Sequence, residues 1–278
     1  MGDPFIGSEM LASGRVTRHQ LRTRFVAIHQ DVYIERGVRP TAVLRAKAAW
    51  LRSRRHGVLA GYSAAALHGA RYIDPGLPAN IIDTNRRAAR GIAVWADAIE
   101  EADICPIGEM RVTTPLRTAL DLARRVDEDA AVVIIDALAR AARLKVADIE
   151  LTAERFEGCK GIKKARKTIG LVNPGAESPQ ESRLRLLIVR AGFPPPETQY
   201  PIFNEYGALI GEADMAWPGL KIAVEYEGRH HTEPDQLRKD IARMDEMMEM
   251  GWMVIRITAR DTPAVTLRKI SRAWTLRS

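Results

Sequence analysis

The sequence predicts an α+β N-terminal region followed by an α/β C-terminal domain, in which helices flank a mixed central sheet. Near the C-terminus, two strand-like runs, 209–216 and 221–227, flank a Trp217-Pro218-Gly219 turn. In the second run Ile222, Val224 and Tyr226 alternate with Ala223, Glu225 and Glu227, which is the period of two that strands require. Apolar residues at helical spacing precede and follow them, over 178–191 and 235–250. We therefore expect the sheet to be covered by helices.

Composition indicates a globular protein with an anionic partner. The 278 residues are 46% hydrophobic and 28% charged, with a formal net charge of +7. Residues 1–60 hold 11 Lys and Arg against 4 Asp and Glu, which equals the whole excess. Such a concentration of cations favours an anionic partner such as nucleic acid. We expect the N-terminal segment to supply it.

Cysteine use and hydropathy predict a cytoplasmic protein. Cys105 and Cys159 are too far apart to suggest a metal site, so we interpret them as reduced thiols. No apolar run reaches the ~18 residues of a membrane span, and no basic-then-apolar leader opens the chain. We expect no membrane partner.

Residues 1–40 have the element order of a small DNA-binding module. A short helix over 8–12 precedes a basic helix over 18–24, for which Thr17 is a suitable cap. Two strand runs, 25–28 and 32–35, follow. Helix, turn, helix and hairpin is the order of a winged helix, which predicts DNA contacts from the basic side chains. The alternative is a solvated basic helix. The predicted contacts are Arg15, Arg18, Arg22 and Arg24.

Residues 41–172 predict a middle α+β domain without assigned chemistry, except for one basic run. Five cations without an acid occur between Gly158 and Lys167, and Asn173-Pro174-Gly175 then marks the start of a C-terminal domain at 173. Such a run is usually a solvated helix face, and a strip that contacts phosphates is the second interpretation. Its members are Lys160, Lys163, Lys164, Arg166 and Lys167.

An acidic face on the C-terminal hairpin predicts a metal site. Glu225 and Glu227 point to the same side of their strand, and Asp214 falls on that side of the partner strand, diagonal to Glu225. The expected Cα separation is roughly 7–8 Å. Carboxylates this close repel each other unless a cation lies between them, and Mg²⁺ (or Mn²⁺) prefers such ligands. An ordinary water-facing strand is the alternative.

Several motifs in this region together resemble the very-short-patch-repair-like (Vsr-like) endonucleases of the PD-(D/E)xK superfamily. These are Asp214, Val224-Glu225-Tyr226-Glu227-Gly228, His231, Ser178-Pro179-Gln180-Glu181, Lys239-Asp240-x-x-Arg243 and Gly251-Trp252-x-Val254-Ile255-Arg256. The resemblance implies a restriction-endonuclease-like fold that holds Mg²⁺ between Asp214 and Glu225. Glu227 stands where the superfamily usually has lysine.

The same resemblance implies roles for the remaining candidate residues. Glu181 would reach the metal site, although its spacing from Ser178 also fits a capping box. Glu227 or His231 would accept the proton, and Asp240 and Arg243 would orient a histidine or hold a phosphate. The predicted catalytic set is therefore Asp214, Glu225, Glu227, His231 and Glu181, with Asp240 and Arg243 beside DNA.

The N-terminal and middle regions are similar to AbiEi-type antitoxins, which repress their own operons and neutralise nucleotidyltransferase toxins. This resemblance implies duplex DNA and a toxin or other operon protein as partners. Two functions follow. One is a Mg²⁺-dependent endonuclease, and the other is a DNA-binding regulator or antitoxin-like protein with a non-catalytic nuclease fold. DNA or RNA as substrate, and the oligomeric state, stay open.

Overall fold

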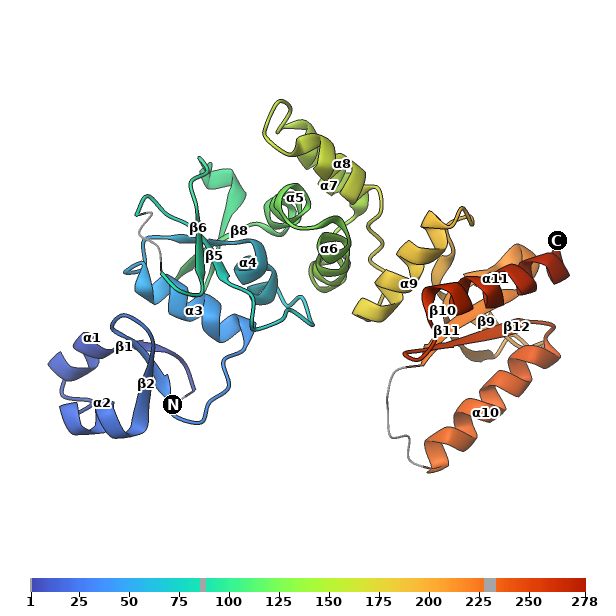
Figure 1. Ribbon diagram of the computed structural model, residues 1–278, viewed down its shortest axis with the longest axis horizontal. Helices are drawn as coiled ribbons and strands as arrows, with labels where there is room; N and C mark the ends of the chain where they lie inside the picture. Colours follow the sequence, from blue (N-terminus) through green and yellow to red (C-terminus); the bar gives the residue numbers. More distant parts are fainter. Residues whose placement is uncertain (1, 86–88, 228–233) are drawn as a thin grey trace. The chain divides into compact units, whose positions relative to one another are not determined.

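The protein is a mixed α/β structure whose sheets are flanked by helices (Figure 1). The computed structural model describes residues 2–85, 89–227 and 234–278, and for 234–240 it describes the backbone alone. The chain forms two compact units, Met1–Pro174 and Gly175–Ser278. In the part of the chain described, no helix is long and apolar enough to cross a membrane.

The first unit begins with two helices and a small antiparallel sheet of order β1-β3-β2. Thr17 and Gln20 form a capping box, in which each side chain accepts the other residue's backbone N–H at 3.2 and 2.9 Å. The predicted order of helix, turn, basic helix and hairpin is confirmed. The elements are β1 (Phe5–Ile6), α1 (Gly7–Ala12), α2 (Arg18–Arg24), β2 (Phe25–His29) and β3 (Val32–Glu35).

The rest of the first unit contains a five-stranded mixed sheet of order β6-β5-β4-β8-β7. Ile6 and Val32 of the small sheet pack with Ala46 and Trp50 of α3, so residues on both sides of position 40 share one hydrophobic cluster. The elements are α3 (Ala42–Arg52), β4 (Val58–Ala60), α4 (Gly61–Leu67), β5 (Ala79–Ile82), β6 (Ile92–Trp95), η1 (Glu101–Asp103), β7 (Ile104–Ile107), β8 (Met110–Thr113), α5 (Pro115–Arg125), α6 (Glu128–Ala142), α7 (Val146–Glu154) and α8 (Ile162–Ile169).

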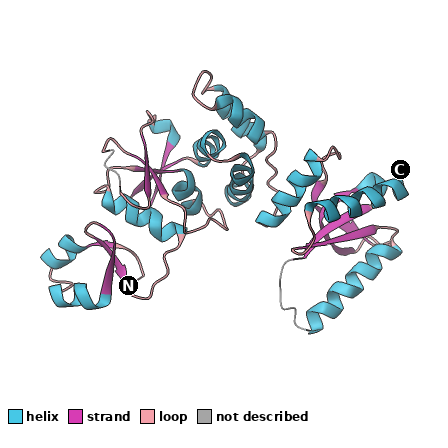
Figure 2. Cartoon of the chain, viewed as in Figure 1, coloured by secondary structure: helices cyan, strands magenta, loops and turns pink. Residues whose placement is uncertain are grey.

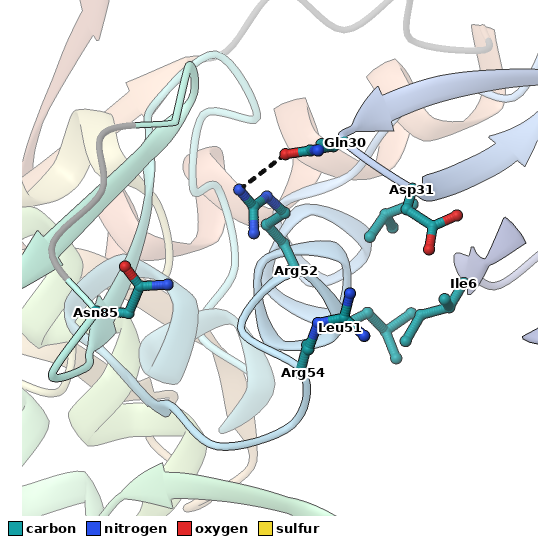
Figure 3. A pocket seen from close by; sticks show the side chains of 8 residues that line it. Ile6, Gln30, Asp31, Leu51, Arg52, Arg54 and Asn85 are labelled. Carbon is teal, nitrogen blue, oxygen red and sulfur yellow. Dashed lines mark hydrogen bonds between the residues drawn. The ribbon is translucent and has the colours of Figure 1, made fainter. Parts of the chain in front are cut away.

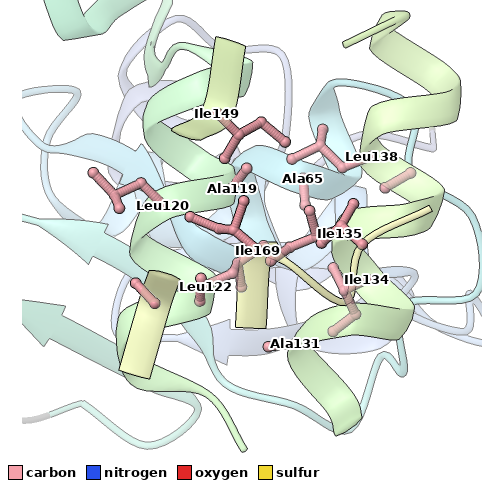
Figure 4. Packing of buried hydrophobic residues seen from close by; sticks show 14 of the residues in the cluster. Ala65, Ala119, Leu120, Leu122, Ala131, Ile134, Ile135, Leu138, Ile149 and Ile169 are labelled. Carbon is pink, nitrogen blue, oxygen red and sulfur yellow. The ribbon is translucent and has the colours of Figure 1, made fainter. Parts of the chain in front are cut away.

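Helices α4 to α8 bury the largest hydrophobic cluster of this unit (Figure 4). Leu120, Ile135 and Ile169 lie fully buried within it. Arg117 is also buried and donates hydrogen bonds to Asp103 and Asp121, both at 2.8 Å. A buried charge is tolerated only when it is paired in this way, so this network is structural.

The second unit is built on a four-stranded sheet of order β12-β11-β10-β9, in which β11 and β12 are parallel and the other pairs antiparallel (Figure 2). The predicted mixed sheet flanked by helices is confirmed, with α11 on one face and α10 on the other (Figure 1). The elements are α9 (Pro179–Arg190), β9 (Glu197–Phe203), β10 (Leu209–Trp217), η2 (Pro218–Leu220), β11 (Ile222–Glu227), α10 (Pro234–Glu249), β12 (Met253–Thr258) and α11 (Pro263–Arg277).

The face that α10 presents to the sheet differs from the one predicted. Its apolar spacing indicated that Ile241 and Met248 point inward, but these side chains are 45% and 50% exposed. Met247 is fully buried instead, and it packs against Ala216 and Ala223 of the sheet. Arg243 lies one turn before Met247 and contacts the carboxylate of Glu225 on β11. This contact turns the Met247 side of α10, and not the Ile241 and Met248 side, toward the sheet.

The apolar sequence of 252–257 is typical of a central strand, but β12 lies at the edge of the described sheet. Val254 packs into the cluster beneath α10, and Ile255 and Ile257 pack into the cluster beneath α9 and α11. Its apolar character therefore comes from burial of both faces and not from a central place.

Candidate metal and nucleic-acid sites

Asp214 and Glu225 lie across from each other on neighbouring strands of the second unit. In the antiparallel pairing of β10 and β11, Met215 faces Val224. Continuing that register by one residue sets Asp214 directly opposite Glu225, where we had expected a diagonal pair. The two carboxylates share one face of the sheet, as the strand period predicted. The turn sets this register, because it ends on Lys221 with a left-handed φ of 49°.

Asp214 is partly buried and its charge is unfavourable. Burial is the main cause that raises its pKa to about 6, and the nearby negative charges of Glu181 and Glu225 raise it further. Two groups act in the opposite direction. The backbone N–H of Tyr226 donates to Oδ2 of Asp214 at 2.7 Å, and the positive charge of Arg243 lies near. Asp214 is thus held in place in an acidic environment.

Glu181 brings a third carboxylate to this place from the first turn of α9. The side chain is 8% exposed, and its Oε2 accepts hydrogen bonds from the Glu177 N–H at 2.8 Å and from Gln199 Nε2 at 3.2 Å. Ser178 caps the helix by accepting the Glu181 N–H at 3.2 Å. Hydrogen bonds therefore fix the side chain of Glu181 at the start of the helix. Its negative charge also raises the pKa of Asp214.

Arg243 of α10 is the cation of this cluster. Its Nη2 lies 3.0 Å from each carboxylate oxygen of Glu225, and its Nη1 donates to the Glu212 carbonyl at 3.3 Å. Close approach needs Gly211, because a Cβ there would lie 2.8 Å from Cδ of Arg243. The sequence associated Arg243 with phosphate, and the structure pairs it with Glu225.

The other predicted catalytic groups are placed less completely. Glu227 forms an ion pair with Arg256 of β12, and both side chains are partly exposed. His231 lies outside the described residues. The backbone of Asp240 belongs to α10, but its side chain is likewise outside what the structure describes.

The acidic cluster offers few ligands to an ion. Within the described part of the chain, no group of three or more His, Cys, Asp or Glu side chains is arranged to hold a metal. Asp214 and Glu225 remain as an adjacent pair of hard oxygen donors. Mg²⁺ is usually bound in this way, through one or two carboxylates and several waters. The residues present therefore fit Mg²⁺ better than an ion that needs a complete protein cage.

The arginines predicted to contact DNA lie on the surface of the first unit. Arg15, Arg18, Arg22 and Arg24 are all exposed, and the last three belong to α2. Arg24 lies 3.7 Å from Glu35, a weak pairing between exposed groups. The helix thus presents three arginines to solvent.

The basic run on α8 is largely engaged by the protein itself. Lys164 donates to the Val126 carbonyl, Arg166 lies 3.8 Å from Glu157, and Lys167 lies 3.0 Å from Glu128. Lys163 is exposed, and the Lys160 carbonyl accepts a hydrogen bond from Arg124 at 3.0 Å. These contacts favour the interpretation of a solvated face over that of a phosphate strip.

A cluster of one histidine and two arginines around α3 was not predicted from the sequence. His29 is 9% exposed, and Arg45 and Arg52 lie near it. Burial chiefly, and then these two positive charges, lower the pKa of His29 to about 4. The only available signal was the spacing of Arg45 and Arg52, two helical turns apart on one face.

Comparisons with known proteins assign no activity. No family model matches the chain, and no solved structure matches it. Uncharacterized proteins from Mycobacterium tuberculosis strains CDC 1551 / Oshkosh and H37Rv are each 34% identical over 150 residues. The alignment covers 54% of this chain and 55% of either relative, so the chain spans about half the length of the curated relatives it matches.

Proposed function

We propose that the second unit is a divalent-metal-dependent phosphodiesterase with a restriction-endonuclease-like fold, and that its substrate is duplex DNA. One observation carries the proposal. Asp214 and Glu225 face each other across two neighbouring strands, and Glu181 approaches from a helix start. A carboxyl group whose pKa is raised by burial and by neighbouring carboxylates, as that of Asp214 is, is characteristic of sites that bind cations or transfer protons.

The chain's own residues prepare this site. Tyr226 fixes one oxygen of Asp214, and Glu177 and Gln199 fix one oxygen of Glu181. When bound, Mg²⁺ or Mn²⁺ lowers the pKa of a water molecule and stabilises charge on the scissile phosphate. Asp214 and Glu225 are the proposed ligands, and Glu227 or His231 is the proposed proton acceptor.

Arg243 has two roles in this proposal. It neutralises Glu225, since its Nη2 contacts both carboxylate oxygens. With a divalent cation held by Asp214 and Glu225, Glu225 would no longer need this partner, and the guanidinium of Arg243 would be free to contact substrate. Planar guanidinium groups bind phosphate oxygens through paired hydrogen bonds. Arg243 is therefore the proposed contact to the DNA backbone, and the role of Asp240 beside DNA rests on the resemblance alone.

The first unit supplies the proposed DNA-binding module. The confirmed helix–turn–helix–hairpin order supports a winged helix, with α2 presenting Arg18, Arg22 and Arg24 toward phosphates or the major groove. The resemblance to AbiEi-type antitoxins adds a toxin or another operon protein as a proposed partner.

A non-catalytic DNA-binding regulator is the second candidate. It is favoured by the ion pairs of the acidic cluster. Arg243 contacts both oxygens of Glu225, and Arg256 pairs with Glu227, the residue that replaces the usual lysine. These pairs balance part of the negative charge without a metal. Such a protein would bind DNA through the first unit and cut nothing.

Cleavage of supercoiled plasmid separates the two candidates. We expect wild type to nick plasmid with Mg²⁺ or Mn²⁺ but not with EDTA, and Asp214→Asn to lose at least about 10² of the rate, because a metal ligand stabilises the transition state. Asp245→Asn is the matched control, since Asp245 is an exposed residue of α10. Equal rates for wild type and Asp214→Asn would refute the nuclease, and no cleavage by any protein would support the regulator.

A further inference from the structure

A cleft in the first unit lies apart from the arginines of α2. It opens between the β2–β3 turn, the end of α3 and the segment after β5 (Figure 3). Its volume is about 510 Å³, and binding sites for small ligands are typically about 300–1,000 Å³. The cleft is therefore large enough for a nucleotide-sized group. Its lining residues are Ile6, Gln30, Asp31, Val32, Leu51, Arg52, Arg54 and Asn85.

Two arginines, Arg52 and Arg54, line this cleft. Arg52 donates to Gln30 Oε1 at 3.3 Å (Figure 3), and among the described residues neither Arg52 nor Arg54 forms an ion pair with a carboxylate. Asp31 lines the cleft, but its oxygens accept the N–H and the hydroxyl of Ser8 at 2.9 and 2.6 Å. The lining therefore carries two positive charges and one negative charge, a formal excess of one positive charge.

A strained turn after α3 directs one of these arginines into the cleft. Arg54 and Arg55 have consecutive left-handed φ angles of 54° and 66°. This conformation is unfavourable for a residue other than glycine, and where it persists it often serves function. Arg55 forms two hydrogen bonds of 2.6 Å with Glu9, whereas Arg54 lines the cleft. The turn therefore sends the two side chains in different directions: Arg55 is hydrogen-bonded to Glu9, while Arg54, whose positive charge also lowers the pKa of Glu9, lines the cleft.

One further arginine, Arg45, belongs to the helix α3 that contributes Leu51 and Arg52 to the cleft. Arg45 lies two turns before Arg52 on α3, and its Nε is buried without a hydrogen-bond partner in the described structure, as is Nε2 of His29. Gly91 lies beside both, because a Cβ there would be 3.6 Å from Nη1 of Arg45 and 4.0 Å from Cε1 of His29. Arg45, Arg52 and Arg54 thus outnumber the one carboxylate of the cleft lining, Asp31, and this excess of positive charge favours a negatively charged ligand.

We propose that this cleft binds a phosphate group of a nucleotide or of a nucleic-acid backbone, with Arg52 and Arg54 as the principal donors. Guanidinium groups match the oxygens of phosphate in geometry as well as in charge. Gln30 lies beside Arg52 and supplies an amide for a neighbouring polar group of the ligand. The site is independent of the acidic cluster and does not require the protein to be a nuclease.

Three probes test the proposal on the full chain: inorganic phosphate, deoxyadenosine monophosphate and a short DNA duplex. We expect Arg52→Gln/Arg54→Gln to bind them about tenfold or more weakly than wild type, because each arginine donates a charge-assisted hydrogen bond. Arg71→Gln/Arg143→Gln removes equal charge from exposed positions of the same unit and should bind like wild type. Circular dichroism establishes that each variant is folded.

The pattern among the probes identifies the source of the phosphate. A free nucleotide is indicated if deoxyadenosine monophosphate binds at least about tenfold more tightly than inorganic phosphate. A backbone phosphate is indicated if those two bind alike while the salt dependence of duplex affinity flattens in Arg52→Gln/Arg54→Gln, by about 0.9 per lost contact. Equal affinities of the two double variants for all three probes would overturn the proposal.

A measurement on wild type covers the case in which the cleft variant does not fold. The charges of Arg45 and Arg52 both lower the pKa of His29. A phosphate bound at Arg52 offsets one of them, so saturating inorganic phosphate should raise the pKa of His29, as followed by NMR of its imidazole protons. Sodium chloride at the same ionic strength is the control. An identical pKa in both salts would contradict binding at this cleft.

Discussion

Asp214→Asn should stabilise the second unit by about 1–3 kcal/mol at pH 7 in metal-free buffer. Burial and neighbouring acids raise the pKa of Asp214 to about 6, above its ordinary value of about 3.9. The folded protein therefore binds this proton more tightly than the unfolded chain. The resulting stability is complete below about pH 4 and is lost as the pH rises toward 6. Asparagine removes the penalty and can still accept the Tyr226 N–H.

Scanning calorimetry of the full chain between pH 4 and pH 7 measures this effect. The free energy of unfolding of wild type should fall relative to that of Asp214→Asn across this range. Asp245→Asn removes the same charge from an exposed position and should track wild type. If Asp214→Asn were less stable than wild type at pH 7, the carboxylate would not lie in a repulsive environment.

Glu225→Gln should have the opposite effect and cost about 1–3 kcal/mol of stability. The Glu225 side chain is 12% exposed and the Arg243 side chain 32% exposed. Glutamine would leave the guanidinium of Arg243 without its negative partner, and the buried Nε of Arg243 already lacks a hydrogen-bond partner among the described residues. An uncompensated, partly buried charge is the physical cause of the loss.

A double-mutant cycle isolates this contribution. Arg243→Gln in the Glu225→Gln background removes the uncompensated charge, so the double variant should lose less stability than the sum of the two single variants. Urea unfolding of the four proteins gives the coupling energy. Additive effects would show that the pair contributes nothing to the fold.

The acidic face could be predicted because it depends on local pattern. The period of a strand places Glu225 and Glu227 on one side, and pairing across a short turn brings Asp214 to that side. The direct pairing of Asp214 with Glu225 was missed, because it depends on a left-handed Lys221 that the sequence does not signal. Helix caps were equally local, as Thr17 and Ser178 show.

Features that depend on distant residues could not be predicted in the same way. Met244, Met247 and Met248 allow more than one apolar face on α10, and the carboxylate of Glu225 decides between them by pairing with Arg243. The cationic cleft joins residues of the first hairpin, α3 and the segment after β5. No sequence period relates these positions, so only the fold brings them together.

Calorimetric titration of Mn²⁺ and Mg²⁺ into the metal-free full chain tests the central claim most directly. The claim is that Asp214 and Glu225 form a divalent-cation site. We expect saturable binding to wild type and to Asp245→Asn, binding lost in Asp214→Asn and Glu225→Gln, and proton release near pH 6 as the ion displaces the proton of Asp214. Saturable binding of equal strength to wild type and Asp214→Asn, or none to wild type, would contradict the account.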